Sequence, residues 1–180
     1  HIVFDGQEHL SVLRDPELRE RSIAVFSFGK TFHATGWKVG YSIAPPELNA
    51  EIRKVHQFVT FTVHRPTQVG LAQWLQHSSH WTGISEMYEK KRDQFLKGLE
   101  KTKFNLVPTK GSYYQAVDYS EISDKNDMEF CTWLTQEIGV AAIPISVFYH
   151  IPPPDQRVIR LCFAKQDSTL KKALKKLQSL

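Results

Sequence analysis

The chain has 180 residues, of which 41% are hydrophobic and 23% charged, a balance typical of a folded globular protein. The formal net charge is only +4, and apart from the run KKALKK near the C-terminus the lysines and arginines are scattered. This distribution argues against a nucleic-acid-binding surface and favours small anions as ligands. No apolar run is long enough to span a bilayer, and no basic, apolar leader is recognisable. We therefore expect no membrane partner.

The cysteines and histidines predict neither a disulfide framework nor a metal site. Cys131 and Cys162 lie far apart, each in an apolar segment that favours burial. His77 and His80 have a spacing that metal sites use, but no cysteine or carboxylate cluster accompanies them. This pattern suits a reducing setting, and we expect the cytoplasm.

The chain opens with HIVFDG, in which the β-prone run Ile2 to Phe4 ends at the turn signal Asp5-Gly6. This opening predicts that an upstream portion of the polypeptide is missing. Two strands then follow, one within Arg21–Phe28 and one within Lys38–Ala44. Helices are predicted at about 47–57, from Pro66 onward and at about 83–101, the last with its polar run EKKRDQ facing solvent.

The sequence pattern changes after Lys103, where proline and glycine residues precede the alternating run SYYQAV. We expect a first domain over residues 1–103 and a second over residues 104–180. In the second domain the patterns predict a helix capped by Asp127 and ending at Gly139, a strand VAAI, a strand at 157–163 and a helix at 168–180. This alternation of strand and helix indicates an α/β or α+β layer packing.

The segment SFGKTFHATGWKVGY, residues 27–41, is the strongest candidate for a functional site. Ser27 lies three residues before Lys30, and Lys38 lies eight after it. A path of strand, turn and strand brings these three side chains together, so that two of them can hold a phosphate. A lysine that is desolvated or placed beside another cation loses its proton readily, so Lys30 is a candidate for forming an imine.

Two other interpretations of this segment compete. Gly29-Lys30-Thr31 matches the end of the phosphate-binding pattern GxxxxGK[ST], but the leading glycine would fall at Ala24, within a run too β-branched and aromatic to form an open nest of amides. Alternatively, both lysines are simply solvated, which is the usual fate of lysines in turns. The spacing alone leaves the solvated and the functional interpretations open.

Four blocks of the sequence carry a resemblance to a known family: SFGKTFHATGWKVGY, APPELNAEIRKVHQF, VAAIPISVFY and RVIRLCF. They closely resemble fold-type I aminotransferases that use pyridoxal 5'-phosphate, and within that group the kynurenine, glutamine and methionine aminotransferase branch. The similarity runs in order along essentially the whole chain. It implies the C-terminal portion of an aspartate aminotransferase-like α/β fold, with the end of the large cofactor domain followed by an α+β small domain.

The resemblance assigns roles to five residues. Lys30 matches the lysine that carries the cofactor and moves a proton at the substrate α-carbon. Ser27 and Lys38 match positions that hold the cofactor phosphate, although the family often has arginine where this chain has Lys38. Arg160 matches the arginine that binds the substrate α-carboxylate, and Arg157 is its rival, since residues three apart on a strand point to opposite faces. Phe61 matches a region that lines the neighbouring subunit's pocket across a dimer interface.

The resemblance therefore implies transfer of an amino group from an L-amino acid, aromatic or sulfur-containing, to a 2-oxo acid by a homodimer. Two alternatives stay open: a cysteine-conjugate β-lyase activity at the same site, and a non-catalytic effector-binding or dimerisation module of a regulator. In the family, the groups that contact the cofactor ring lie upstream of the first residue of this chain. We accordingly expect the 180 residues alone to bind the cofactor poorly.

Overall fold

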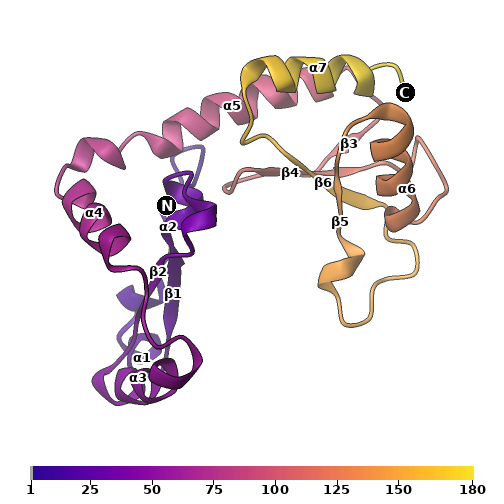
Figure 1. Ribbon diagram of the computed structural model, residues 1–180. Helices are drawn as coiled ribbons and strands as arrows, with labels where there is room; N and C mark the ends of the chain where they lie inside the picture. Colours follow the sequence, from indigo (N-terminus) through magenta and orange to yellow (C-terminus); the bar gives the residue numbers. More distant parts are fainter. Residues whose placement is uncertain (1) are drawn as a thin grey trace. The chain divides into compact units, whose positions relative to one another are not determined.

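The structure is a computed structural model that describes residues 2–180, and it divides into two compact units (Figure 1). One unit is Glu8–Ile84, and the other combines the N-terminal segment up to Gln7 with Ser85–Leu180. Helix α5 (Ile84–Leu99) lies almost entirely in the second unit, where it packs with the C-terminal elements. The assignment of residues 1–103 and 104–180 to the domains of a complete protein stays a prediction.

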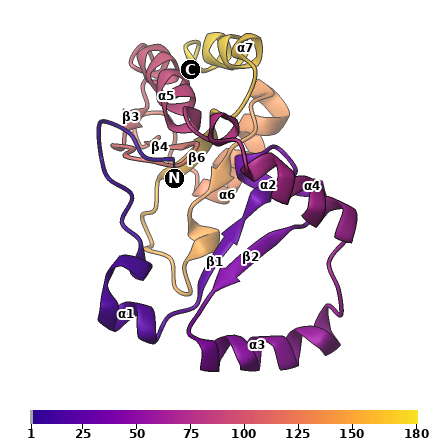
Figure 2. The same ribbon diagram turned by 90° about the vertical axis from the view of Figure 1, so that its left-hand side faces the viewer.

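The unit Glu8–Ile84 is built around a ribbon of two antiparallel strands. Its elements in chain order are η1 (Val12–Arg14), α1 (Pro16–Glu20), β1 (Ala24–Ser27), α2 (Phe28–Thr31), η2 (Thr35–Trp37), β2 (Gly40–Ile43), α3 (Pro46–Val59), α4 (Arg65–Leu75) and η3 (Ser78–His80). Figure 2 shows α2 at one end of the ribbon and α3 at the other. Both predicted strands are confirmed, each shorter than expected at its ends.

The helices of this unit begin where the prolines predicted. Pro46 is the first residue of α3, and Pro66 is the second residue of α4. Proline suits these positions because its fixed φ is already helical and its missing N–H would have no partner within the first turn. The expected helix at 47–57 thus extends to Pro46–Val59, and the third helix, expected at 83–101, is α5.

The second unit contains a four-stranded antiparallel sheet. Its elements are α5, β3 (Asn105–Leu106), β4 (Tyr114–Asp118), α6 (Asp127–Trp133), a π-helical segment (Leu134–Ile138), β5 (Ile143–Pro144), η5 (Ser146–Phe148), β6 (Val158–Cys162) and α7 (Asp167–Leu177). The strands are ordered β3-β4-β6-β5, with Ala116 of β4 opposite Arg160 of β6. The strands and helices expected here are present, although only Ile143 of the VAAI run is in a strand.

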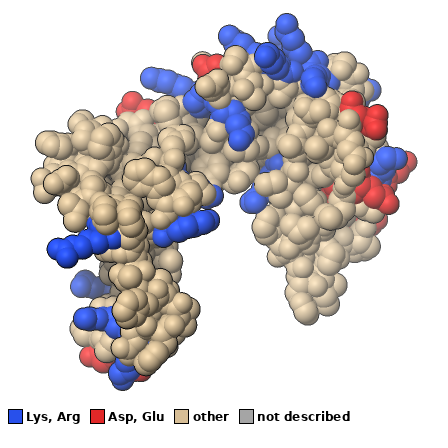
Figure 3. All heavy atoms as spheres, in the orientation of Figure 1, with Lys and Arg blue, Asp and Glu red and all other residues tan. Residues whose placement is uncertain are grey.

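The core of this unit forms between one face of the sheet and its helices. Val117, Ile159 and Leu161 are buried on alternate positions of β4 and β6. Helices α5 and α7 run side by side along the sheet (Figure 1), so closely that a Cβ at Gly98 would meet Leu174 at 2.4 Å. Figure 3 shows lysine side chains gathered over the outer side of α7, as the amphipathic pattern predicted. Apolar burial between sheet and helices holds this unit together.

The start of α6 differs from the sequence prediction. Asn126 is the N-cap, because its side-chain oxygen accepts a hydrogen bond from the Glu129 N–H at 2.9 Å. Asp127, which was predicted to cap, is instead buried within the first turn and bonds Ser146. The π-helical segment Leu134–Ile138 continues α6, and this helical run stops at Gly139 as predicted, with the left-handed φ of 71° that glycine tolerates at a C-terminus.

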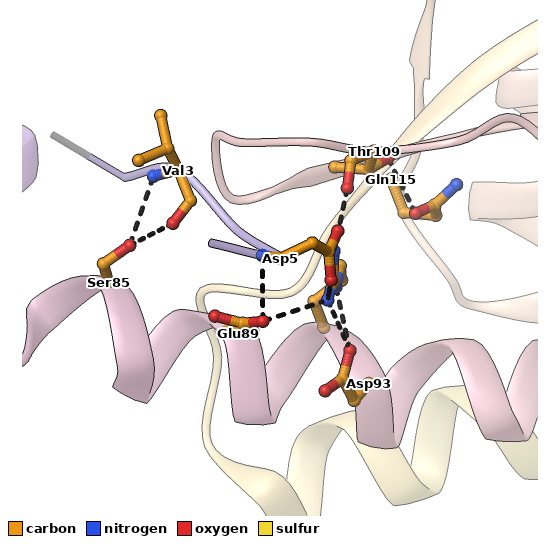
Figure 4. A network of polar contacts seen from close by, with 8 residues as sticks. Val3, Asp5, Ser85, Glu89, Asp93, Thr109 and Gln115 are labelled. Carbon is orange, nitrogen blue, oxygen red and sulfur yellow. Dashed lines mark hydrogen bonds and ion pairs between the residues drawn. The ribbon is translucent and has the colours of Figure 1, made fainter. Parts of the chain in front are cut away.

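The expectation that EKKRDQ faces solvent is wrong for Arg92, which is only 6% exposed. Its guanidinium binds both carboxylate oxygens of Asp5 at 2.7 Å and also donates to the Thr109 carbonyl oxygen (Figure 4). This contact ties the N-terminal segment to α5, and about two turns earlier on the same helix Ser85 exchanges hydrogen bonds with the Val3 backbone. The charged run EKKRDQ alone does not indicate that a segment distant in the sequence covers Arg92.

None of the helices in the described part of the chain has the length and apolar character needed to cross a membrane. Cys131 is buried and Cys162 is half-buried, and both thiols are free. Burial raises the pKa of the Cys131 thiol to about 12. Among residues 2–180, no three histidine, cysteine or carboxylate side chains gather as metal ligands would.

Candidate functional site

Ser27, Lys30 and Lys38 line one hollow in the unit Glu8–Ile84. The hollow has a volume of about 330 Å³, and its remaining lining comes from Gly29, Thr35, Val39 and Gly40. The three side chains that the sequence singled out are therefore brought together by local structure alone. Strand β1 delivers Ser27, helix α2 carries Lys30, and the turn before β2 carries Lys38.

Short-range hydrogen bonds shape the hollow. Ser27 ends β1 and caps α2, because its Oγ accepts a hydrogen bond from the Gly29 N–H at 3.1 Å. The Thr35 hydroxyl donates to the Gly29 carbonyl oxygen at 3.0 Å, which ties the following turn to α2. The backbone of Lys38 adopts a left-handed φ of 54°, an uncommon conformation for lysine. Such a conformation is held in place by surrounding structure and is often found at functional sites.

The electrostatic character of the hollow favours an anion. The lining residues include two lysines and no carboxylate. Within residues 2–180 neither lysine ammonium group forms a hydrogen bond or an ion pair, so both remain able to bind a ligand. The Ser27 hydroxyl accepts from Gly29 and keeps its own hydrogen to donate. Two cations and a hydroxyl donor around a small hollow match the needs of a phosphate.

Arg160 belongs to the other compact unit, where it lies in the middle of β6. Its guanidinium carbon lies 4.3 Å from the centre of the Tyr114 ring and 4.4 Å from the centre of the Phe148 ring. Its Nε is buried without a hydrogen-bond partner among the described residues. An arginine without an internal carboxylate partner is free to bind one from a ligand.

Of the two arginines only Arg160 lies on β6, which begins at Val158, so the alternation of faces along a strand does not apply to Arg157. Arg157 precedes β6, and its charge acts on the Tyr119 hydroxyl, whose pKa burial raises to about 12. Arg160 shares its face of the sheet with Val158 and Cys162, opposite to the buried face. The structure thus places the two arginines in different surroundings.

Phe61 lies just after α3, is 80% exposed and has a left-handed φ of 66°. It lines a hollow with Arg53, Lys54, His56 and Gln57, which is separate from the hollow of Lys30. The structure therefore does not bring Phe61 to Lys30 within this unit. Its role across a subunit interface stays a prediction.

Tyr114 and Phe148, the two rings beside Arg160, were not predicted from the sequence. For Tyr114 a signal was present, because the alternation in SYYQAV places it two positions from Ala116, which pairs with Arg160. For Phe148 there was none, since it lies in the short turn η5 outside any regular strand pattern.

Comparison with known proteins places this architecture in a family. The aminotransferase class I and II family matches residues 2–177 of the chain. The chain is 51% identical over 181 residues to the methionine aminotransferase of Escherichia coli and 30% identical over 198 residues to human kynurenine–oxoglutarate transaminase 1. These alignments cover 100% and 98% of this chain and 47% of each relative. The chain thus spans about half the length of the curated relatives that it matches.

Solved structures agree with this similarity. The crystal structure that identifies a methionine aminotransferase function in Escherichia coli superposes with a TM-score of 0.94 at 51% identity. The N-succinyldiaminopimelate aminotransferase of Mycobacterium tuberculosis superposes with a TM-score of 0.91 at 31% identity. Each comparison covers 99% of this chain and 47% of the other. The expected aspartate aminotransferase-like α/β fold is confirmed, and the chain belongs to the aminotransferase class I and II family.

Proposed function

We propose that this chain forms the part of a pyridoxal 5'-phosphate-dependent aminotransferase that holds the cofactor and the substrate carboxylate. The complete enzyme would transfer the amino group of an L-amino acid to a 2-oxo acid. The observation that carries the proposal is the hollow shared by Ser27, Lys30 and Lys38, in a chain that belongs to this family.

The residues of the hollow fit the cofactor. Lys38 supplies a positive charge to the phosphate and Ser27 a hydroxyl donor, while Lys30 supplies the amine that the aldehyde requires. Gly40 lets β2 approach β1 closely at the wall of the hollow, because a Cβ at this position would lie 2.4 Å from the Phe26 carbonyl oxygen. When bound, pyridoxal phosphate supplies an electron sink for the electrons released at the substrate α-carbon.

In this proposal Lys30 is the residue that moves the proton. Its Nζ would take the proton from the substrate α-carbon and pass it to C4′ of the cofactor, acting first as base and then as acid. The residues that line the hollow include no carboxylate that would compete with the cofactor for this amine.

Arg160 is proposed to bind the α-carboxylate of the substrate. A planar guanidinium meets a carboxylate through two parallel hydrogen bonds, which fixes the orientation of the α-carbon as well as adding affinity. Within the described residues Arg160 has no acidic partner that would compete for these bonds.

Methionine is the amino donor that we propose first, since the relative at 51% identity is a methionine aminotransferase. Aromatic donors such as kynurenine come second, on the similarity to kynurenine–oxoglutarate transaminases at 30–34% identity.

We further propose a homodimer in the cytoplasm. Support for the dimer comes from large apolar side chains that the unit Glu8–Ile84 leaves exposed, among them Val25, Phe58 and Phe61. Two free thiols suit the reducing compartment.

Chemical trapping of the cofactor tests the proposal. The full-length protein is mixed with pyridoxal phosphate, reduced with borohydride and digested, and the labelled peptide is identified by mass spectrometry. We expect the label on Lys30 and its loss in Lys30→Ala, together with the absorbance of the lysine-bound cofactor. Lys90→Ala, at an exposed position of α5, serves as the matched control and should label as the wild type does. An unchanged spectrum in Lys30→Ala would overturn the proposed role.

A further inference from the structure

Arg160 is held by aromatic rings and not by hydrogen bonds. The rings of Tyr114 and Phe148 both lie within 4.4 Å of its guanidinium carbon, close enough for cation–π attraction. Its Nε is buried without a partner, whereas the two terminal nitrogens remain accessible and form no hydrogen bond or ion pair within residues 2–180. The rings therefore restrain the guanidinium without using up its hydrogen-bond donors.

The sheet register explains the position of the first ring. Ala116 of β4 pairs with Arg160, and Tyr114 pairs with Cys162. Because alternate residues of a strand share one face, Tyr114 and Arg160 lie on the same face of the sheet at diagonal positions. A long or aromatic side chain reaches across such a diagonal.

A buried hydrogen-bond pair explains the position of the second ring. Phe148 ends the short turn η5, which begins two residues after strand β5. The carboxylate of Asp127 accepts hydrogen bonds from both the backbone N–H and the hydroxyl of Ser146, each at 2.7 Å. Asp127 is 3% exposed and belongs to α6, so the first residue of η5 is fastened to a rigid element. This anchor fixes the turn that presents Phe148 to Arg160.

We propose that Tyr114 and Phe148 are positioning residues for Arg160, and that the Asp127–Ser146 pair is the anchor that holds Phe148 in place. The inference rests on the proposed function, in which Arg160 binds the substrate carboxylate. With Nε enclosed, the carboxylate is bound through the two terminal nitrogens of Arg160 and approaches the guanidinium end-on. A guanidinium already held in one orientation loses less freedom on binding, so the rings increase affinity without touching the reacting atoms.

Binding of a substrate-like carboxylate tests this role separately from turnover. The probe is 4-(methylthio)butanoate, which is methionine without its amino group, titrated calorimetrically into the full-length protein loaded with pyridoxal phosphate. We expect Tyr114→Leu and Phe148→Leu each to weaken binding about three- to tenfold, the range that cation–π contacts support. Phe148→Tyr and Tyr114→Phe keep the ring and should therefore bind the probe as the wild type does.

Steady-state kinetics give a second readout. Loss of a contact that stabilises ground state and transition state equally raises KM and leaves kcat unchanged. We therefore expect the leucine variants to raise KM for methionine by the same factor as the probe Kd. Ser146→Ala, which removes one of the two bonds to Asp127, should show a smaller change in the same direction. Val147→Ala, at an exposed position of the same turn, is the matched control and should bind as the wild type does.

The outcomes separate this inference from the proposed function. If Arg160→Leu abolishes probe binding while both leucine variants bind normally, the positioning role is wrong and the carboxylate role of Arg160 stands. If Arg160→Leu itself binds the probe normally, the carboxylate role fails and this inference fails with it. If either leucine variant does not fold, Ser146→Ala provides the test. Normal probe binding and an unchanged KM in that folded variant would overturn the proposal that the Asp127–Ser146 pair holds Phe148 in place.

Discussion

Gly40 lies directly opposite Ser27 at the last register position of the β1–β2 ribbon. A Cβ on Gly40 would meet the carbonyl oxygen of Phe26 at 2.4 Å, a distance that real Cβ contacts do not reach. Two adjacent backbones thus approach so closely that only glycine fits between them. The approach matters for the site, because Gly40 and Ser27 line the same hollow as Lys30 and Lys38.

Replacing Gly40 with alanine tests this close approach. The clash is with backbone, which cannot move aside as a flexible side chain does, so we expect Gly40→Ala to lower the free energy of unfolding by about 1–3 kcal/mol. It should also weaken binding of pyridoxal phosphate, because the strand that carries the wall of the hollow must shift. Gly36→Ala is the control, since a Cβ there meets nothing within 4 Å. Chemical denaturation and cofactor titration measure both effects, and equal behaviour of the two variants would contradict the argument.

The charge of Lys38 is expected to hold the cofactor phosphate. Lys38→Asn removes this charge with a residue that tolerates the left-handed φ of 54°, so the turn itself is preserved. In the full-length protein we expect the Kd for pyridoxal phosphate to rise about tenfold, equivalent to about 1.4 kcal/mol. Lys38→Arg keeps the charge and should retain most of the affinity. A Kd in Lys38→Asn equal to that of the wild type would show that Lys38 does not contact the phosphate.

The ion pair between Asp5 and Arg92 makes stability depend on pH. The hydrogen bonds from Arg92 lower the pKa of Asp5 below its ordinary value of about 4. A carboxyl group with a lowered folded-state pKa stabilises the protein fully above its unfolded-state pKa, and this contribution is lost as the pH falls through the folded-state value.

We therefore expect Asp5→Asn to lower the unfolding midpoint at pH 7, and the difference from the wild type to shrink as the pH falls below about 4. Asp124→Asn, at an exposed position without such a pair, should leave the midpoint unchanged at both pH values. Thermal unfolding at a series of pH values measures the difference. A destabilisation that stayed constant down to the lowest pH would mean that packing, and not charge, explains the effect.

The thiol of Cys131 should resist alkylation in the folded protein. Burial raises its pKa to about 12, so hardly any reactive thiolate is present near neutral pH. We expect iodoacetamide at pH 8 to leave Cys131 unmodified for as long as the protein stays folded, and to modify it fully in denaturant. Mass spectrometry of the peptide that contains Cys131 provides the measurement. Rapid labelling of the native protein would show that α6 opens readily at this position.

Much of the architecture could be predicted because its signals are local. The strands β1 and β2, the helices α3, α4 and α5, and the stop at Gly139 of the helical run that begins with α6 have local causes. They follow from β-prone runs, prolines, helical periodicity and a glycine at the helix end. The same holds for the grouping of Ser27, Lys30 and Lys38. These three residues lie within twelve positions of one another, so one short helix and one turn are enough to bring them into a common hollow.

The structure differs from the sequence predictions where a segment distant in the sequence binds or covers a residue. Aspartate is a common N-cap residue, which is why Asp127 was predicted to cap α6. In the structure Asn126 is the N-cap, and Asp127 instead binds Ser146, nineteen positions away. Arg92 belongs to a charged helical face, yet the N-terminal segment covers it. In each case a hydrogen bond formed over a long sequence distance outweighs the local preference, since a buried polar group must find a partner.

The family, most of the strands and helices, and the lysine cluster that we propose holds the cofactor can be read from the sequence alone. The partners of the remaining polar groups become visible only in the folded protein: the rings beside Arg160, the carboxylate that binds η5 and the N-terminal aspartate that pairs with Arg92. The physical reason is the range of the interactions. Periodicity and turn chemistry act between neighbours along the chain, whereas burial and hydrogen bonding in a core depend on which distant segments the fold brings together.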